Sequence, residues 1–443
     1  MRARDGAVRG PSRGFIIGPS PLPSIPWKEL RAFDLPVTSP ADAALPDAAL
    51  RATAAPAAPP RGVLPVAYAS FVLVGWTGLF VPSYLRVIQD EFGRTDAEFG
   101  LVYLVFALMF ATGAVSGGLI AERIGRRIVL PAAALLIAIG LAMESVAPAW
   151  TAFVVGAGLA GAGTGAVDAV VNSAVMDLSA AGRGSGLSRL HLFYSIGALS
   201  AALVVSVLAG IGIGWRPVAV ATAIAGLAIA FPIRRVGLVP PRRRAPADAA
   251  SAGQGRSGIG RPLRLAMAAL GIAIACYVAA EAGVTSWLVG YLVEEPMSVA
   301  TLALGLFWSG LAAGRLVASR IADRFDPTVF TAACAFASAL ALLAAVAGPP
   351  GPLRIVLFIA TGFAFGPVYP MIMTVAGALL PHRAAAVSGA LTAAGVAGAI
   401  SYPALMGIIS ELAGLGAAMV GAALLAAVSG GAVIIARRMA TRR

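Results

Sequence analysis

Long apolar segments recur along this sequence from Leu64 almost to its end. Each holds roughly 20 residues, which as a helix cross a hydrocarbon layer of about 30 Å. The segments are continuous and do not alternate apolar with polar residues, so they do not fit the strands of a membrane β-barrel. We expect twelve membrane-spanning helices in two sets of six, at 63–83, 98–119, 128–147, 151–174, 190–211 and 216–233, then at 264–292, 299–319, 328–347, 353–376, 386–409 and 413–436.

Polar segments flank and separate the two sets. Residues 1–62 are rich in Pro, Ala and Arg and cannot bury enough apolar surface to order themselves, which predicts a disordered tail. An arginine-rich linker, 234–263, joins an N-terminal six-helix bundle, 63–233, to a C-terminal one, 264–436, and a short basic tail, 437–443, follows.

Composition and charge support lipid as the solvent. The chain is 59% hydrophobic and 12% charged, with a mean hydropathy of +0.87, too apolar for a soluble protein. A net charge of +13 would suggest nucleic acid in a soluble protein, but here the basic residues lie between the spans. The positive-inside rule therefore predicts a multi-pass protein of the inner (plasma) membrane, with both termini and the linker in the cytoplasm and no nucleic-acid partner. The four Arg residues on the other side are Arg86, Arg94, Arg216 and Arg354.

Other chemistries find little support in the residues. Cys276 and Cys334, each inside an apolar segment, suggest neither a disulfide framework nor a metal site. No paired histidines, nucleophile elbow or phosphate-binding loop occurs, so an enzyme is the weakest interpretation and no cofactor is expected. Without an ATP-binding domain, energy must come from an ion gradient or a partner.

The two halves repeat each other at an offset of 201 residues. Chance would rarely keep one offset over both a loop and a distant span. The sequence thus predicts an all-α membrane protein of two pseudo-symmetric six-helix bundles, the pattern of transporters that rock about a central site. The matching pairs are Gly113 and Gly314, Glu122-Arg123 and Asp323-Arg324, Gly161 and Gly362, and Gly165 and Gly366.

The loop after the second span, from Gly118 to Arg127, resembles the cytoplasmic signature of the major facilitator superfamily. The resemblance implies a cytoplasmic gate, in which a glycine lets a neighbouring helix approach and an acid sits at a helix N-terminus. Arginines of this loop would bind carboxylates or phosphates of membrane lipid. The gate residues expected are Gly118, Glu122, Arg123, Arg126 and Arg127, with Arg315, Asp323 and Arg324 in the second half.

More narrowly, segments 190–198, 280–292, 307–315 and 366–370 look like the fucose:proton symporter family, a group of sugar permeases. That resemblance implies an essential acid in the fourth span, where Asp168 is the matching residue.

Two acids lie well inside the spans. An ionised side chain at mid-membrane costs about 2.5–3.5 kcal/mol or more, so one that persists usually faces a cavity. Asp168 has Asn172 one turn further on the same helical face, and a carboxyl group there could load and release a proton. Glu281, close to Gly283, is the second candidate for proton coupling. The alternatives are a structural contact between helices for Asp168, and an ion pair or hydrogen bond at the outer gate for Glu281.

A substrate site would need further polar and aromatic groups. Asn172 is the only Asn in the chain, which makes a richly hydroxylated sugar less favourable than a smaller or more apolar solute. With no Arg or Lys expected at mid-span, a strongly anionic substrate is disfavoured as well. Besides Asn172, the candidate substrate-binding residues are Trp76, Tyr194, Tyr277, Trp287, Tyr291, Trp308 and Tyr369. For each aromatic residue, packing in a core or an interface belt is the alternative.

The sequence therefore predicts a proton-coupled uptake permease that moves a small neutral or weakly polar solute, with sugars and their derivatives among the candidates, by alternating access. Its expected partners are that solute, the proton and membrane lipid, and a monomer is expected. A drug or metabolite exporter working by proton antiport is the nearest alternative. A membrane solute sensor that does not transport is the alternative from another class.

Overall fold

The computed structural model describes residues 62–178, 183–235, 260–380 and 384–441, and every regular element in these ranges is a helix. The predicted disordered tail and most of the predicted linker lie outside the described residues. The helices are α2 (Val63–Phe92), α3 (Asp96–Ile124), α4 (Arg126–Val146), α5 (Trp150–Leu178), α6 (Arg183–Gly210), α7 (Trp215–Arg235), α9 (Arg261–Tyr291), α10 (Met297–Ile321), the short η3 (Ala322–Arg324), α11 (Pro327–Ala347), α12 (Pro352–Phe365), α13 (Val368–Leu379), α14 (Ala384–Ala413) and α15 (Leu415–Thr441).

These helices follow the predicted spans. Within the described ranges, 11 segments are long and apolar enough to cross a membrane, and α7 adds a shorter apolar helix, Trp215–Ile229. The first span continues to Phe92, past the predicted end at 83, so that it includes Asp90 and Glu91. The helix α2 ends at Phe92 because the next residue, Gly93, adopts a left-handed conformation with φ 60°.

The next helix begins at once. The side chain of Thr95 accepts a hydrogen bond from the backbone N–H of Glu98, and the Glu98 carboxylate accepts one from the N–H of Thr95. This capping box satisfies N–H groups that the first turn of α3 would otherwise leave unpaired.

The predicted span 353–376 is interrupted between α12 and α13. Pro367 follows Gly366 and has no N–H to donate, and its ring hinders a continuous helix. The N–H of Gly366 still bonds the carbonyl of Gly362, and the N–H of Met371 bonds that of Pro367. The interruption is therefore confined to one turn.

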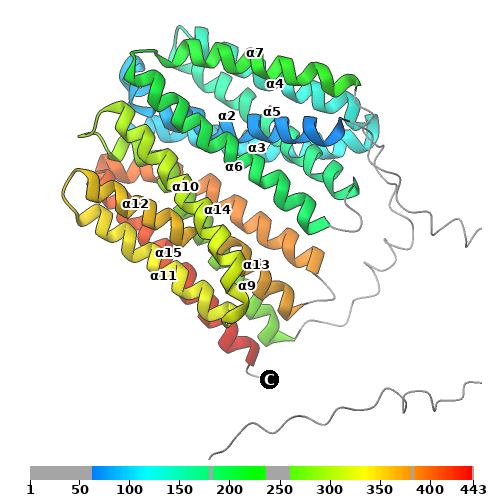
Figure 1. Cartoon of the computed structure of the whole chain (residues 1–443), viewed down its shortest axis with the longest axis vertical. Coiled ribbons are helices and arrows are strands. Elements are labelled where there is room, and N and C mark those ends of the chain that lie inside the picture. The colour runs from blue at the N-terminus through cyan, green and yellow to red at the C-terminus, as the bar shows by residue number, and fades with distance from the viewer. Residues whose placement is uncertain (1–61, 179–182, 236–259, 381–383, 442–443) are drawn as a thin grey trace, which may run out of the picture. The chain divides into compact units, whose positions relative to one another are not determined.

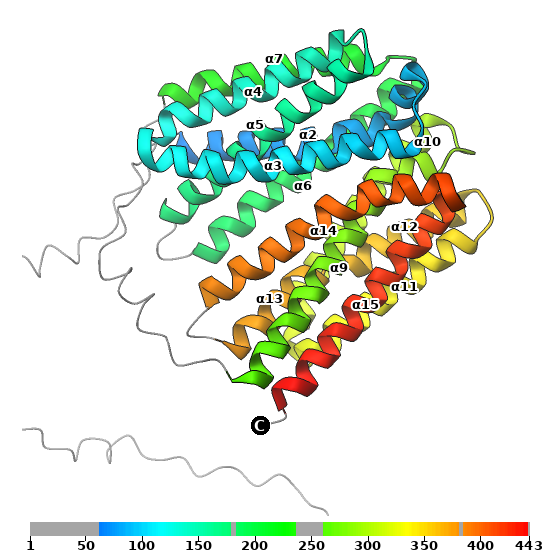
Figure 2. The ribbon, with the colours of Figure 1, turned by 180° about the vertical axis from the view of Figure 1, so that it is seen from behind.

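Figures 1 and 2 show the helices in two groups, α2 to α7 and α9 to α15. Both belong to one compact unit, Ala58–Arg443. We call the side of the membrane reached by the start of α2 and the end of α15 the tail end, and the side of the loops 93–95 and 292–296 the short-loop end. In both views the two groups approach each other at the short-loop end and diverge toward the tail end.

The internal repeat is visible in helix contacts. A Cβ atom added to Gly165 would overlap the carbonyl oxygen of Phe110, and one added to Gly366 would overlap that of Leu311. Likewise, Gly161 faces the carbonyl of Phe106, and Gly362 that of Phe307, each partner again 201 residues from its counterpart. The α3–α5 contact of the first bundle thus recurs as the α10–α12 contact of the second, which explains the glycine pattern in the sequence.

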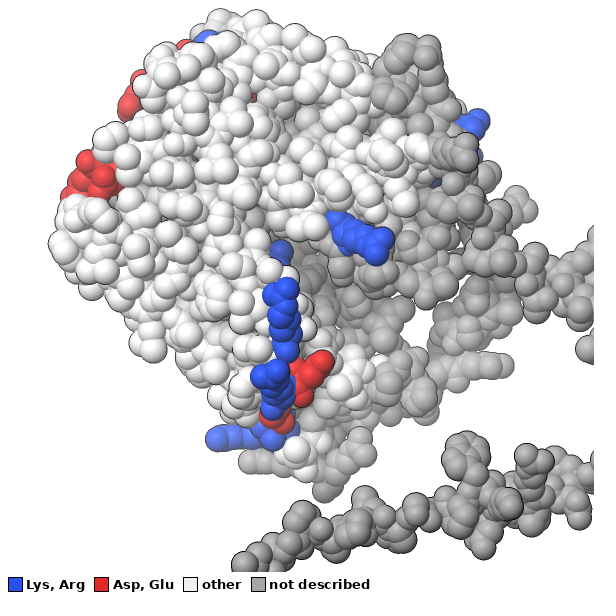
Figure 3. All heavy atoms as spheres, viewed as in Figure 1, with Lys and Arg blue, Asp and Glu red and all other residues white. Residues whose placement is uncertain are grey.

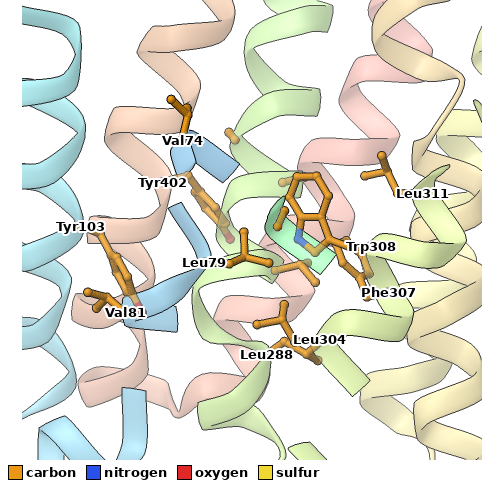
Figure 4. Packing of buried hydrophobic residues seen from close by; sticks show 14 of the residues in the cluster. Val74, Leu79, Val81, Tyr103, Leu288, Leu304, Phe307, Trp308, Leu311 and Tyr402 are labelled. Atoms are coloured by element: carbon orange, nitrogen blue, oxygen red, sulfur yellow. The ribbon is translucent and has the colours of Figure 1, made fainter. Parts of the chain in front are cut away.

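Apolar side chains fill the seam between the bundles near the short-loop end. Leu79 of α2 points toward Leu304 and Trp308 of α10 (Figure 4), and all three belong to one buried cluster. The space-filling view (Figure 3) shows Lys or Arg side chains, drawn in blue, near the boundary between the bundles toward the tail end.

We predict that Gly165→Ala and Gly366→Ala each destabilise the protein, because a methyl group would push apart helices in backbone contact. Overpacking of this kind costs about 1–3 kcal/mol. Gly118→Ala and Gly271→Ala are the matched controls, since no described atom lies within 4 Å of a Cβ at either position. Melting temperatures of the four purified variants should separate the pairs, and equal values would contradict the packing described.

Candidate functional site

The seam is closed at the short-loop end by hydrogen bonds between the bundles. The hydroxyl of Tyr103 donates to the carbonyl oxygen of Ser286 at 2.8 Å, and that of Ser206 donates to the carbonyl oxygen of Ser298 at 2.6 Å. Arg86 of α2 donates to carbonyl oxygens in the loop after α9, those of Leu292 and Glu295, at 2.9 and 3.0 Å.

A second set of hydrogen bonds joins α3 to α14. The backbone N–H of Ala97 donates to the Glu411 carboxylate at 3.0 Å, and the Ser410 hydroxyl donates to the carboxylate of Asp96. Because Glu411 meets the first turn of α3, the helix dipole adds to this contact. These hydrogen bonds between the bundles all lie toward the short-loop end, so they lock the two bundles there.

On the tail-end side of this closed layer, α5 brings Asp168 and Asn172 to the seam. Gly165, one turn before Asp168, fixes α5 against α3, and the half-buried Asp168 forms a side-chain hydrogen bond with Asn172. The amide oxygen of Asn172 is buried and has no hydrogen-bond partner among the described residues. An unpaired buried acceptor costs about 1–3 kcal/mol, which suits a position where a bound group donates to it.

Tyr194 of α6 connects the two bundles at this depth. Its ring lies 6.0 Å from that of Trp308 on α10. The phenol interacts electrostatically with Asp168 on one side of the seam and with Glu281 and Arg315 on the other. Trp308 is buried, and its indole N–H makes no hydrogen bond to any described residue.

The second bundle contributes Tyr277 and Glu281 from α9 and Arg315 from α10. Tyr277 interacts with both Glu281 and Arg315, although its buried hydroxyl has no partner at good hydrogen-bond geometry. Arg315 donates from Nε to the carbonyl oxygen of Gly366, at the α12–α13 interruption, at 3.3 Å. We call Asp168, Asn172, Tyr194, Tyr277, Glu281 and Arg315 the central cluster.

Arg315 has contacts that the sequence did not predict. The sequence suggested a helix-end residue acting with Asp323 and Arg324, but its interactions are with Tyr277, Glu281, Tyr194 and the Gly366 carbonyl. Its long side chain reaches from the last third of α10 toward the centre of the seam.

The other candidate aromatics divide between the cluster and the bundle interiors. Tyr369 lies 6.5 Å from Tyr277 between ring centroids, beside the cluster. Trp76 turns to α7, where its indole N–H donates to the Thr222 hydroxyl at 2.9 Å. Trp287 is fully buried near the closed end, and its indole N–H donates to the carbonyl oxygen of Pro403 at 2.8 Å.

Tyr291, also near the closed end, donates its hydroxyl hydrogen bond to the Val346 carbonyl at 3.2 Å and stacks beneath Arg354. The structure therefore does not bring Trp76, Trp287 or Tyr291 to the central cluster. A residue's position in the sequence gives its depth along the helix but not the direction in which its side chain points.

The predicted gate residues lie at the tail end. The side chains of Glu122, Arg123 and Arg127 are exposed, as are those of Asp323 and Arg324 in η3, whereas Arg126 is buried and engaged. Gly118 makes no close helix contact in the described part of the chain. That contact is made one residue earlier, because Gly113 and Gly117 lie on the face of α3 that meets α5.

Sequence reasoning passed over Glu144 of α4. Its side chain is 1% exposed, and one carboxylate oxygen has no partner among the described residues. Glu144 lies against Gly156 of α5 inside the first bundle and away from the seam. The sequence did carry a signal for this residue, since an acid stands two residues before the end of an apolar helix.

The family follows from the sequence itself. Residues 66–401, most of the chain, match the sequence profile described as Major Facilitator Superfamily. The chain belongs to the Major Facilitator Superfamily. This protein is accordingly a multi-pass membrane transporter and not an enzyme, which confirms the predicted fold class.

Solved structures share the fold at low sequence identity. A bacterial homologue of the human lysosomal transporter Spinster, inward-facing and unoccupied, superposes with a TM-score of 0.69 at 15% identity, covering 85% of this chain and 96% of that one. The xylose transporter XylE from E. coli, in an inward open conformation, gives 0.65 at 15% identity, with 83% and 94% covered. The E. coli fucose:proton symporter FucP gives 0.57 at 20% identity, with 85% and 98% covered. No curated protein matches the chain.

The closed layer gives a prediction about this transporter. Tyr103→Phe removes one hydrogen bond between the bundles, so it should favour opening at the short-loop end by up to about tenfold, given 0.5–1.5 kcal/mol for such a bond. The readout is the labelling rate of Thr285→Cys, a buried position, by a maleimide added from that side after replacing Cys276 and Cys334.

Tyr402→Phe is the matched control. Its hydroxyl makes the same kind of bond, to the Ala418 carbonyl at 2.7 Å, but inside one bundle. Faster labelling in both variants, or in neither, would show that the Tyr103 bond does not hold the seam closed.

Proposed function

We propose that this protein is a secondary transporter that carries a small solute of zero net charge across the inner membrane by alternating access, coupled to uptake of a proton. The observation that carries the proposal is the charge arrangement of the central cluster. Asp168 and Glu281 contribute two carboxyl groups against one guanidinium, that of Arg315.

The two acids have different surroundings. Glu281 and Arg315 interact with each other, whereas the hydrogen-bond partner of Asp168 among the described residues is the neutral Asn172. An ionised carboxylate without a cation is costly in a seam of low polarity, so Asp168 is the group that gains most from binding a proton. A proton there also gives the cluster zero net charge, which permits the bundles to close around it.

Charge at the two membrane faces supports the orientation. At the short-loop end Arg94, Arg216 and Arg354 pair with Glu98, Glu91 and Glu294 at 2.8, 2.6 and 3.0 Å. At the tail end the arginines of the loop after α3 and of η3 are exposed. The positive-inside rule then favours a cytoplasmic tail end, and a seam open toward the cytoplasm.

Proton coupling predicts a separation of two activities in Asp168→Asn. The variant should retain solute exchange across proteoliposomes while losing accumulation driven by a pH gradient, since one pH unit supplies about 1.4 kcal/mol, or tenfold accumulation, per proton. The solute is the one that most raises the melting temperature of the purified protein.

Glu294→Gln, a surface acid at the short-loop end, is the control and should keep both activities. Undiminished accumulation by Asp168→Asn would overturn Asp168 as the proton carrier. Accumulation when the pH gradient is reversed would instead indicate an exporter that works by antiport.

A further inference from the structure

The guanidinium of Arg315 is only partly used by the protein. Its Nε donates to the Gly366 carbonyl, which fixes the plane of the group. Its other side-chain contact within the cluster is with the phenol of Tyr277, and it forms no ion pair with a described residue. A guanidinium carries five N–H donors, so beyond these contacts its Nη atoms can still present a fork that matches the two oxygens of a carboxylate.

The carboxylate of Glu281 interacts with the phenol of Tyr277. It is half-buried and forms no ion pair with Arg315 in the described part of the chain, although the two charges interact across the hydroxyl of Tyr277. Opposite charges this close in a seam of low polarity would normally pair directly. Here Arg315 is bonded to the Gly366 carbonyl at the α12–α13 interruption, and Glu281 lies on α9.

A site with one positive and one negative group that form no direct ion pair with each other is complementary to a ligand with the opposite arrangement. We propose that the transported solute is a small zwitterion, such as an amino acid, whose carboxylate binds the Nη atoms of Arg315 and whose ammonium binds Glu281. This proposal rests on the proposed function, and it specifies the class of neutral solute. The shortage of amide side chains agrees, because a zwitterion needs two charged partners and few hydroxyl-binding groups.

The rest of the cluster fits the same ligand. Tyr277, between the two charges, can donate to the carboxylate, and Trp308 and Tyr194 provide aromatic surface beside it. Asp168 lies across the seam, with Tyr194 between it and the charged pair. The proton and the zwitterion therefore have separate sites, and neither changes the charge balance of the other.

The test is a melting-temperature screen of the purified full-length protein with glycine, leucine, β-alanine, γ-aminobutyrate and 6-aminohexanoate, which span a range of charge separations. Xylose and fucose serve as hydroxylated comparisons. We expect at least one amino acid to raise the melting temperature, while its carboxamide, which lacks the carboxylate, and its N-acetyl derivative, which lacks the ammonium, do not.

Variants assign the two ends of the ligand. Arg315→Gln should weaken binding of that amino acid by about tenfold or more and remove the preference over the carboxamide. Glu281→Gln should remove the preference over the N-acetyl derivative. Arg320→Gln, an exposed arginine further along α10, is the control and should leave both preferences intact.

Should a variant fail to fold, the ligand series on the unmodified protein decides alone. A screen in which no amino acid stabilises the protein overturns the zwitterion. If xylose or fucose stabilises it instead, and Asp168→Asn still loses accumulation of that sugar, the proposed transport function stands without this inference.

Discussion

The structure depends on one constraint: a charged or ionisable side chain in a membrane-spanning helix is costly in lipid, and the three that belong to the central cluster lie where two helical bundles meet. Asp168, Glu281 and Arg315 come from three helices in two bundles, yet they interact at one depth of the seam through Tyr194 and Tyr277. Each ionised group would cost several kcal/mol in hydrocarbon, whereas in the seam each has polar neighbours and access to one membrane face. The cost of keeping charge in the membrane thus explains why these three residues lie together at one site.

That site works because the bundles themselves are rigid. Glycines such as Gly165 and Gly366 let helices pack on each other's backbone, and the same contact occurs in both halves. Helices packed this closely move as units, so change is confined to the seam between the bundles. The closed end is held by hydrogen bonds of single side chains, among them Tyr103 and Ser206, which can be exchanged for others when the seam reopens. Rigid halves and a replaceable seal are the physical requirements of alternating access.

Sequence reasoning predicted the helices, the repeat and the family because these depend on patterns along one dimension. The length of each apolar segment predicts a span. A single offset of 201 residues pairs glycines of the two halves, and the paired glycines make equivalent helix contacts in the structure. The direction of a side chain around its helix was harder to predict. Trp287 was at a suitable depth but is buried near the closed end, and Gly118 lies one residue from the glycine that makes the contact. The contacts of Arg315 were missed for a related reason, since the reach of its side chain does not follow from its position in α10.

The central claim is that Asp168 exchanges its proton with water through the open side of the seam. Infrared difference spectroscopy of the purified protein measures it directly, because a protonated carboxyl group buried among helices absorbs apart from the amide bands. The account predicts a carboxyl band that appears and disappears reversibly as the bulk pH is varied and that is missing in Asp168→Asn. A band that stays constant at every pH, or one that persists unchanged in the variant, would contradict it.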